Sequence, residues 1–204
     1  MGGRHEGRRE RFIVASANPH KVAELRELLA TAIPDLDLQP RPPGAPDVEE
    51  TSDTLAGNAL LKAEALVALT GFAAIADDTG LFVPALGGAP GVRTARYAGH
   101  AATPADNRSK LLHALEGLTL SERGAEFRTV VVLARPDGET LVAAGRVEGR
   151  IAEAERGDRG FGYDSVFIPL EGDGRTFAEM EEGEKHSLSH RGRAVRALAA
   201  MLLQ

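Results

Sequence analysis

The amino-acid sequence predicts an α/β domain built on a mixed β-sheet. In the first half of the 204-residue chain, short apolar runs alternate with segments of helical periodicity, a pattern typical of strand–helix–strand units. In the second half, two apolar runs flank Pro136-Asp137-Gly138 and predict an antiparallel hairpin. Parallel crossover units combined with a hairpin give a sheet of mixed strand direction.

The first expected elements are a strand, a helix and a second, short strand. Residues 11–15 (RFIVA) form the expected first strand, and a small-residue turn follows. Asn18 is the expected N-cap of the next helix, with Pro19 at its first position. The second strand covers residues 36–38, and residues 41–46 form a Pro-rich loop.

The next segment contains a helix over residues 54–70 and a buried strand over residues 72–76. This strand runs directly into the adjacent carboxylates Asp77 and Asp78. We expect it to end there and to be followed by a turn at Thr79-Gly80. Residues 81–83 are a candidate continuation of the strand.

The second half begins with an irregular segment. Residues 86–99 hold four glycines and a proline, which predicts an ordered functional loop or a surface excursion. Thr103 and Pro104 open a helix that reaches about Leu115. The remaining expected elements are strands at 127–134, 140–147 and 166–169 and a last helix over 189–203.

Composition excludes several classes of protein. The net charge is −6, so no global basic field indicates binding to a nucleic-acid polymer. The chain has no cysteine, which excludes disulfides and thiolate metal sites and fits a reducing compartment; we expect a cytoplasmic protein. No apolar run approaches the ~20 residues that span a membrane. Residues 1–10, rich in Arg and Gly, are expected to be a disordered leader before a single domain over residues 11–204.

The acidic residues carry the strongest chemical signal. Two ionised carboxylates side by side, as at Asp77 and Asp78, repel each other unless a cation joins them or one keeps its proton. At the end of a buried strand, where clefts are common, this predicts a divalent metal and phosphate chemistry. Glu49 and Glu50, taken alone, are better explained as solvated loop charges.

Three further groups suit the parts of a nucleotide. Residues 16–21 place a strand, a turn and a helix N-terminus together, as in anion sites, although a capped surface helix gives the same pattern. Lys185, His190 and Arg191 put cations near the start of the last helix, where the dipole disfavours them, so an electron-rich ligand or a nearby acid must compensate. Residues 161–164 offer aromatic rings for a base or for the core. Together these groups predict a magnesium nucleotide.

At this point the sequence resembles the inosine triphosphate pyrophosphatases, which clear deaminated purine nucleoside triphosphates from the nucleotide pool. Five segments match in family order and cover the chain from Arg11 onward. The matching segments are SANPHKVAELRELL from Ser16, EETSDTLAGNALLKA from Glu49, ADDTGLFVPALGGAPGVRTARYAG from Ala76, GFGYDSVFIP from Gly160 and EKHSLSHRGRAVRAL from Glu184.

The resemblance implies an elongated mixed sheet with flanking helices, in two lobes with the active site in the cleft between them. It implies a homodimer, Mg²⁺ as cofactor and a purine nucleoside triphosphate as substrate, with no role for a nucleic-acid polymer or a membrane. The reaction would be hydrolysis between the α- and β-phosphates. Arg191 and Lys185, which only donate hydrogen bonds, would suit the 6-keto group of hypoxanthine or xanthine.

The resemblance also assigns roles to residues. Glu49 and Asp78 correspond to the metal-binding positions, and Asp78 is also the expected general base, with Asp77 or Glu50 nearby. The substrate-binding residues would be Ser16, Ala17, Asn18, Pro19, His20, Lys21, Thr79, Phe161, Gly162, Tyr163, Asp164, Lys185, His190 and Arg191. In this set Ser16, Asn18 and Lys21 hold the triphosphate, while the residues from Phe161 onward form the base-binding end.

The chain departs from the family pattern at a few positions. Ala17 and His20 stand where many members have Gly, Thr79 replaces a common Ser, and Ser165 replaces a common Pro. None of these changes removes a charged group. Two alternatives remain: a Maf-like pyrophosphatase acting on other modified or pyrimidine nucleotides, and a nucleotide-binding sensor without catalysis.

Overall fold

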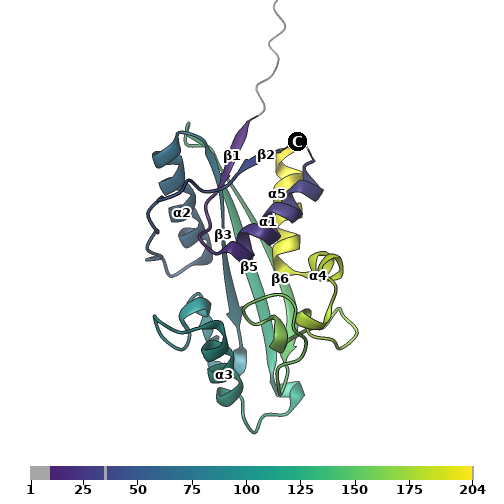
Figure 1. Ribbon diagram of the computed structural model, residues 1–204. Helices are drawn as coiled ribbons and strands as arrows, with labels where there is room; N and C mark the ends of the chain where they lie inside the picture. Colours follow the sequence, from purple (N-terminus) through teal and green to yellow (C-terminus); the bar gives the residue numbers. More distant parts are fainter. Residues whose placement is uncertain (1–9, 35, 204) are drawn as a thin grey trace, which may run out of the picture.

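The computed structural model describes residues 10–34 and 36–203, and its centre is a seven-stranded mixed sheet flanked by helices (Figure 1). The strand order is β2-β1-β3-β5-β6-β7, with β4 paired to β3. The predicted α/β fold with a mixed sheet is therefore confirmed, whereas the division into two lobes stays a prediction. The strands are β1 (Arg11–Val14), β2 (Asp37–Gln39), β3 (Ala73–Phe82), β4 (Pro90–Gly91), β5 (Gly124–Ala134), β6 (Thr140–Ile151) and β7 (Phe167–Pro169).

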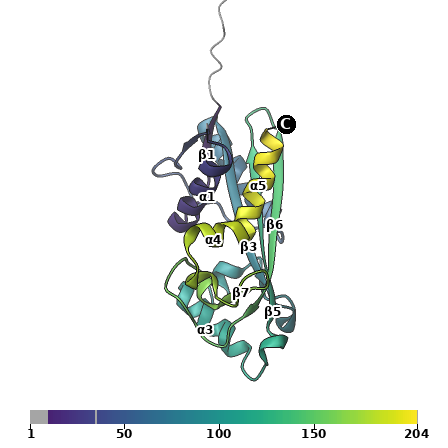
Figure 2. The same cartoon turned by 90° about the vertical axis from the view of Figure 1, so that its right-hand side faces the viewer.

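The helices pack on both faces of the sheet, and a third group covers its far end. They are α1 (Pro19–Ala32), α2 (Leu55–Thr70), α3 (Pro104–Ala114), α4 (Glu182–Leu188) and α5 (His190–Leu202). Figure 1 shows α1, α2 and α5 at the end of the sheet where β1 lies, and both Figures 1 and 2 show α3 at the opposite end. No helix of the described chain combines the length and the apolar character that a membrane crossing requires.

The core follows the alternation of β3. Ile75 packs with α1 and α5 in one apolar cluster, whereas Ala74 and Ala76 pack with α2 in another. Successive side chains of a strand point to opposite faces, so this pattern fixes which face every later residue of β3 occupies. A third cluster, around Leu81 and Phe127, lies toward α3.

The local helix signals of the sequence are confirmed. The Asn18 side chain caps α1, Pro19 occupies its first position, and Thr103 forms a capping box at α3. Gly71 ends α2 in the left-handed conformation that glycine tolerates best. The hairpin of β5 and β6 is also confirmed, although both strands extend beyond the predicted bounds. The sequence did not predict α4, a short helix separated from α5 by Ser189, whose side chain caps α5.

The predicted turn at Thr79-Gly80 is wrong. Residues 73–82 form one uninterrupted strand, because β5 pairs antiparallel with it from Ala74 to Phe82. Gly80 serves a close approach instead of a turn: a Cβ at this position would lie 2.8 Å from the carbonyl oxygen of Gly91 on β4. Asp77 and Asp78 therefore lie inside the strand, on opposite faces, and do not end it.

The cleft next to β3 arises because its other neighbour is short. The parallel pairing of β1 with β3 ends at Val14 opposite Ile75, and β4 begins to pair only at Leu81. Between these points no strand of the described residues lies beside this edge of β3. The turn that follows β1 and the N-terminus of α1 lie at this gap.

The leader expected at residues 1–10 falls almost wholly outside the described residues. Its last residue, Glu10, is described and forms an ion pair with Arg135, whose Nε lies 2.7 Å from Glu10 Oε1. The assignment of residues 11–204 to one domain stays a prediction.

The contact between β6 and α5 can be tested at Gly145. A Cβ on this residue would lie 2.2 Å from the carbonyl oxygen of His190 and 2.5 Å from the backbone nitrogen of Ala194. We expect Gly145→Ala to lower the free energy of unfolding by about 1–3 kcal/mol, as overpacking does. Urea unfolding of the variant measures this.

Gly124→Ala is the matched control, since a Cβ there has no atom within 4 Å. We expect this variant to stay within about 0.5 kcal/mol of the wild type. Equal stability of the two variants would contradict the packing of α5 on β6.

Candidate active site

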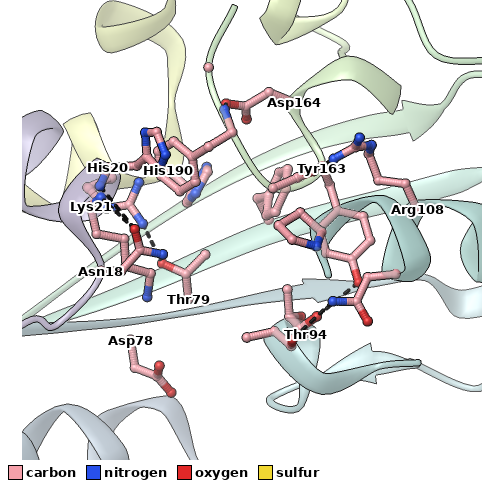
Figure 3. Close-up of a pocket in the computed structure, with 18 of the residues that line it drawn as sticks. Asn18, His20, Lys21, Asp78, Thr79, Thr94, Arg108, Tyr163, Asp164 and His190 are labelled. Atoms are coloured by element: carbon pink, nitrogen blue, oxygen red, sulfur yellow. Dashed lines mark hydrogen bonds between the residues drawn. The ribbon is translucent and has the colours of Figure 1, made fainter. Parts of the chain in front are cut away.

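A cavity of about 500 Å³ lies along the gap beside β3 (Figure 3). Its walls come from the N-terminus of α1, β3, the segment before α3, α3 itself, the loop before β7 and the start of α5. The predicted site residues that line it are Asn18, His20, Lys21, Glu50, Asp78, Thr79, Phe161, Gly162, Tyr163, Asp164, His190 and Arg191. Those that do not are Ser16, Ala17, Pro19, Glu49, Asp77 and Lys185.

The N-terminus of α1 does not present free backbone donors as the sequence suggested. The Asn18 Oδ1 atom accepts hydrogen bonds from the backbone N–H groups of His20 and Lys21, at 3.0 and 3.4 Å. The Ser16 hydroxyl accepts from the Asn18 N–H group at 3.2 Å. The cap therefore occupies the backbone N–H groups that a bound anion would otherwise accept from. The Lys21 side chain is the positive group of this turn that lines the cavity.

Asp77 is the anion that neutralises the cations at the two helix N-termini. Its Oδ2 atom accepts from Nε and Nη2 of Arg191, both at 3.1 Å, and lies 3.5 Å from Lys21 Nζ. Burial would raise the pKa of Asp77, but Lys21 and then Arg191 hold it well below its usual range. Asp77 is thus a buried, ionised counter-ion. The sequence predicted that it could help to activate the attacking water, but its position outside the cavity lining does not support this role.

Asp78 belongs to a separate charge group on the α2 face. Lys62 of α2 donates through Nζ to Asp78 Oδ1 and Glu50 Oε1, each at 3.1 Å, and to the backbone oxygen of Asp77 at 2.7 Å. Arg96 holds the other oxygen of Glu50 at 3.0 Å. Burial raises the pKa of the Asp78 carboxyl although Lys62 opposes the rise, and a carboxylate of raised pKa is a better proton acceptor.

The end of the cavity that was predicted to bind the base contains Asp164, which forms a buried ion pair with Lys185. Asp164 Oδ2 accepts from the Phe161 N–H group and from Lys185 Nζ, both at 2.8 Å. Gly160 is required beside them, because it has a φ of +71° and a Cβ would lie 2.2 Å from Asp164 Oδ2. The Nζ atom of Lys185 binds the Asp164 carboxylate and lies 5.0 Å from the centre of the Phe161 ring. Lys185 does not line the first cavity.

Arg191 connects the two ends of the cavity. Besides its bonds to Asp77, it donates from Nη1 to Glu24 Oε2 and from Nη2 to the Thr79 hydroxyl at 3.1 Å. These contacts use four of its five N–H groups. The guanidinium carbon lies 5.6 Å from the centre of the Phe161 ring, so the last donor is close to the surface where a base would stack.

His190 is buried and neutral. Its ring stacks on Phe127 with 4.4 Å between the centroids, and within the described chain its Nδ1 atom has no hydrogen-bond partner. Burial, followed by the charges of Arg191 and Lys185, lowers the pKa of His190 well below its usual value. The resemblance placed His190 at the base, and it does line the cavity.

Sequence reasoning missed several residues that line the cavity or bind residues that line it. Asn58 and Lys62 are spaced as i and i+4 in α2, whose other residues are mostly apolar, and this spacing puts both on one helix face. Polar residues are unusual on a helix face that packs against a sheet, so this pattern in the sequence could have identified Asn58 and Lys62 as candidate site residues. The others are Glu24, Arg96, Thr94, Asn107 and Arg108, which carry no such local signal.

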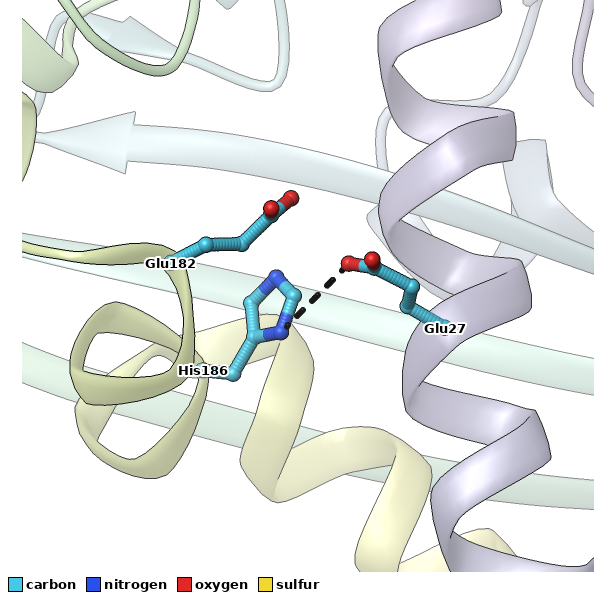
Figure 4. A group of neighbouring side chains, drawn as sticks. All are labelled: Glu27, Glu182 and His186. Carbon is cyan, nitrogen blue, oxygen red and sulfur yellow. Dashed lines mark ion pairs between the residues drawn. The ribbon is translucent and has the colours of Figure 1, made fainter.

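Two carboxylates are suitably placed for a metal. Glu50 and Asp78 line the cavity at the Lys21 end, whereas Glu49 is exposed and does not. The metal role that the resemblance gave to Glu49 therefore suits Glu50 better. A different group, Glu27, Glu182 and His186 (Figure 4), brings three potential ligand atoms within 4.8 Å of one another. None of these three residues lines the first cavity.

A second cavity of about 340 Å³ adjoins the first and shares His20, Gly160 and Phe161 with it. The His20 ring stacks on Phe161 at a centroid distance of 5.6 Å. The two rings therefore stand between the cavities. His20, one of the departures from the family pattern, thus contacts the base-binding end and not only the phosphate turn.

Comparisons with known proteins agree on one family. The sequence model of the Ham1 family matches residues 12–201. The dITP/XTP pyrophosphatase of Methylococcus capsulatus is 46% identical, with 95% of this chain and 96% of the relative covered. That of Streptomyces avermitilis is 44% identical, with coverage of 94% and 96%. The solved structure of a HAM1 protein from Coxiella burnetii superposes with a TM-score of 0.84 at 40% identity, covering 95% of this chain and 98% of that one.

The buried, neutral His190 predicts a dependence of stability on pH. Below about pH 6.5 the unfolded chain binds a proton at this residue and the folded chain does not. The wild type should therefore lose stability as the pH falls from about 7.5 to 5.5, with a contribution of up to about 1.4 kcal/mol per pH unit from His190. His190→Gln should lack this contribution in urea unfolding.

The control is His113→Gln, since the His113 side chain on α3 is 81% exposed. Its stability should follow the wild-type curve across the same pH range. If the curve of His190→Gln also runs parallel to the wild type, His190 is not held neutral in the folded protein.

Proposed function

We propose that this chain, which belongs to the Ham1 family, is a nucleoside-triphosphate pyrophosphatase acting on dITP, ITP and XTP. The products would be the nucleoside monophosphate and pyrophosphate. The observation that carries this proposal is a single cavity with a charged end at Lys21, Glu50 and Asp78 and a base-binding end at Phe161 and Asp164. The family match favours this activity over the Maf-like alternative and over a sensor without catalysis.

Asp78 is the proposed general base. It lines the cavity, and Lys62 and Asn58 hold its two oxygens in place. From this position it would orient the attacking water and take its proton. Lys21, on the other face of β3, would bind the phosphates as a point charge that Asp77 holds in place.

The proposed metal is Mg²⁺, held by Glu50 and Asp78. The fit rests on Lys62, whose ammonium group already lies between one oxygen of each carboxylate, so the pair is arranged around positive charge. Protein sites for Mg²⁺ commonly use one or two carboxylates together with substrate phosphates. When bound, Mg²⁺ would neutralise the phosphates and polarise the reacting one.

The buried charges at the other end account for base selection. The remaining donor of Arg191 suits a keto oxygen, and the Asp164 carboxylate suits a ring N–H group. Lys185 acts through Asp164 in this proposal, since it does not line the cavity. A homodimer and a cytoplasmic location stay predictions.

Turnover of a nucleotide panel tests the activity. With Mg²⁺ present, we expect dITP, ITP and XTP to be converted to monophosphate and pyrophosphate, and dATP to be used at least about tenfold less efficiently, because of its unmatched amino group. Ion-exchange chromatography of the products measures this. Asp78→Asn should lower turnover of dITP by at least about 100-fold. Preferred hydrolysis of dATP, or near wild-type rates for Asp78→Asn, would overturn the proposal.

Adjacent glutamates offer a test of the metal assignment. Glu50→Gln should raise the Mg²⁺ concentration needed for half-maximal activity by about tenfold or more, because a metal ligand is lost. Glu49→Gln, which removes the same charge at an exposed position outside the cavity, should behave like the wild type. Titration of both variants with Mg²⁺ measures the difference, and the reverse result would return the metal to Glu49.

A further inference from the structure

The wall of the cavity that contains Thr94 and Tyr163 is held together by two consecutive residues of α3. Asn107 is buried, donates to the backbone oxygen of Ala95 at 3.0 Å and accepts from the Ala98 N–H group at 2.7 Å. These bonds fix the segment between β4 and α3, which forms one side of the wall. The next residue, Arg108, points toward the opposite side, the loop that contains Tyr163 (Figure 3).

Arg108 binds this loop at two points. Its Nη1 atom donates to the backbone oxygen of Gly162 at 2.9 Å, and its Nε atom donates to Glu155 Oε2 at 2.8 Å. The Ser165 hydroxyl donates to the same Glu155 oxygen at 3.0 Å. The Arg108 side chain is 19% exposed and its bond to Gly162 is partly buried, whereas Glu155 is 43% exposed and its bond to Arg108 faces water. The bond to the Gly162 carbonyl group is therefore the better shielded of the two anchors, and its charged donor makes it stronger than a neutral hydrogen bond.

Tyr163 links the loop back to the segment before α3. Its hydroxyl donates to the backbone oxygen of Thr94 at 2.9 Å, and this bond is buried. A continuous path of covalent and hydrogen bonds thus runs from Asn107 through the segment at Ala95 and Thr94 to Tyr163, and back from Gly162 to Arg108. Each residue named on this path lines the cavity.

The loop needs such restraints because of its glycines. Gly160 and Gly162 have φ angles of +71° and +63°, in the left-handed region, on either side of Phe161. Glycine leaves the chain many alternative conformations, and fixing one costs more entropy than for other residues. Asp164 fixes the N–H group of Phe161, and Arg108 fixes the carbonyl group of Gly162. Without Arg108, the segment after Phe161 loses one of these two anchors.

We propose that Arg108 is a positioning residue for nucleotide binding: by holding Gly162 and Glu155, it fixes the loop that carries Phe161 and Asp164 against α3. The inference rests on the proposed function, since it takes this loop as the base-binding wall. Arg108 then acts on the base end of the substrate and not on the phosphates. Its loss weakens binding of the ground state and the transition state alike, which raises KM and leaves kcat nearly unchanged.

Steady-state kinetics with dITP test this. Arg108→Gln should raise KM about tenfold, the typical effect of losing a charged hydrogen bond, with kcat within about twofold of the wild type. Glu155→Gln, which removes the charge of the distal anchor at a residue that does not line the cavity, should raise KM in the same direction. In a double-mutant cycle the two changes should add to less than the sum of their separate effects.

Inorganic tripolyphosphate, which has no base, distinguishes positioning from direct contact with the phosphates. Its inhibition constant against dITP turnover should be the same for the wild type and Arg108→Gln. The proposal is overturned if Arg108→Gln leaves KM for dITP unchanged, if it weakens tripolyphosphate inhibition to the same extent, or if Glu155→Gln has no effect while Arg108→Gln does.

Arg193→Gln is the matched control. Arg193 also joins a backbone oxygen, that of Arg146 at 3.1 Å, to a glutamate, Glu171 at 2.6 Å, and it lines neither of the two cavities described above. Its kinetics should equal those of the wild type. A rise in KM for this variant similar to that for Arg108→Gln would also overturn the proposal. Failure of the proposed function looks different, because the wild type itself would then not hydrolyse dITP.

Discussion

The uninterrupted pairing of β3 with β5 decides which cations Asp77 and Asp78 can reach. Because β3 stays paired from Ala74 to Phe82, Asp77 and Asp78 must project to opposite faces of the sheet. Asp77 therefore forms ion pairs with Lys21 of α1 and Arg191 of α5, and Asp78 forms one with Lys62 of α2. Had the strand ended at Ala76, the two carboxylates could have turned to one side and competed for the same cation.

The charges on the α1 and α5 side form a buried, nearly balanced network. Asp77, Glu24 and Asp164 face Lys21, Arg191 and Lys185. Burying so many ions costs desolvation energy that apolar residues of similar size would avoid. The network is therefore poorly explained as a source of stability. It is better explained by the fixed orientation that it gives Arg191, since four of the five donors are already committed.

The sequence predicted those parts of the site that depend on local rules. The cap at Asn18, the helix starting after Thr103 and the grouping of cations near Arg191 follow from residue types at fixed spacing. The opposite faces of Asp77 and Asp78 could not be predicted this way, because they depend on pairing with β5, about fifty residues away. The choice between Glu49 and Glu50 likewise depends on Lys62 and Arg96, which in the described part of the chain form ion pairs with Glu50 and not with Glu49.

In the proposed function, base selection would follow from the rigidity of this arrangement. A purine with a 6-keto group presents an acceptor at position 6 and a donor at N1, which match one remaining Arg191 donor and the Asp164 carboxylate. Adenine reverses both groups, so donor faces donor and acceptor faces acceptor. Arg191 cannot turn away without breaking bonds to Asp77 and Glu24, and Asp164 cannot turn without releasing Lys185 and the Phe161 N–H group. The mismatch is therefore not relieved by local movement, and each unpaired buried group costs about 1–3 kcal/mol.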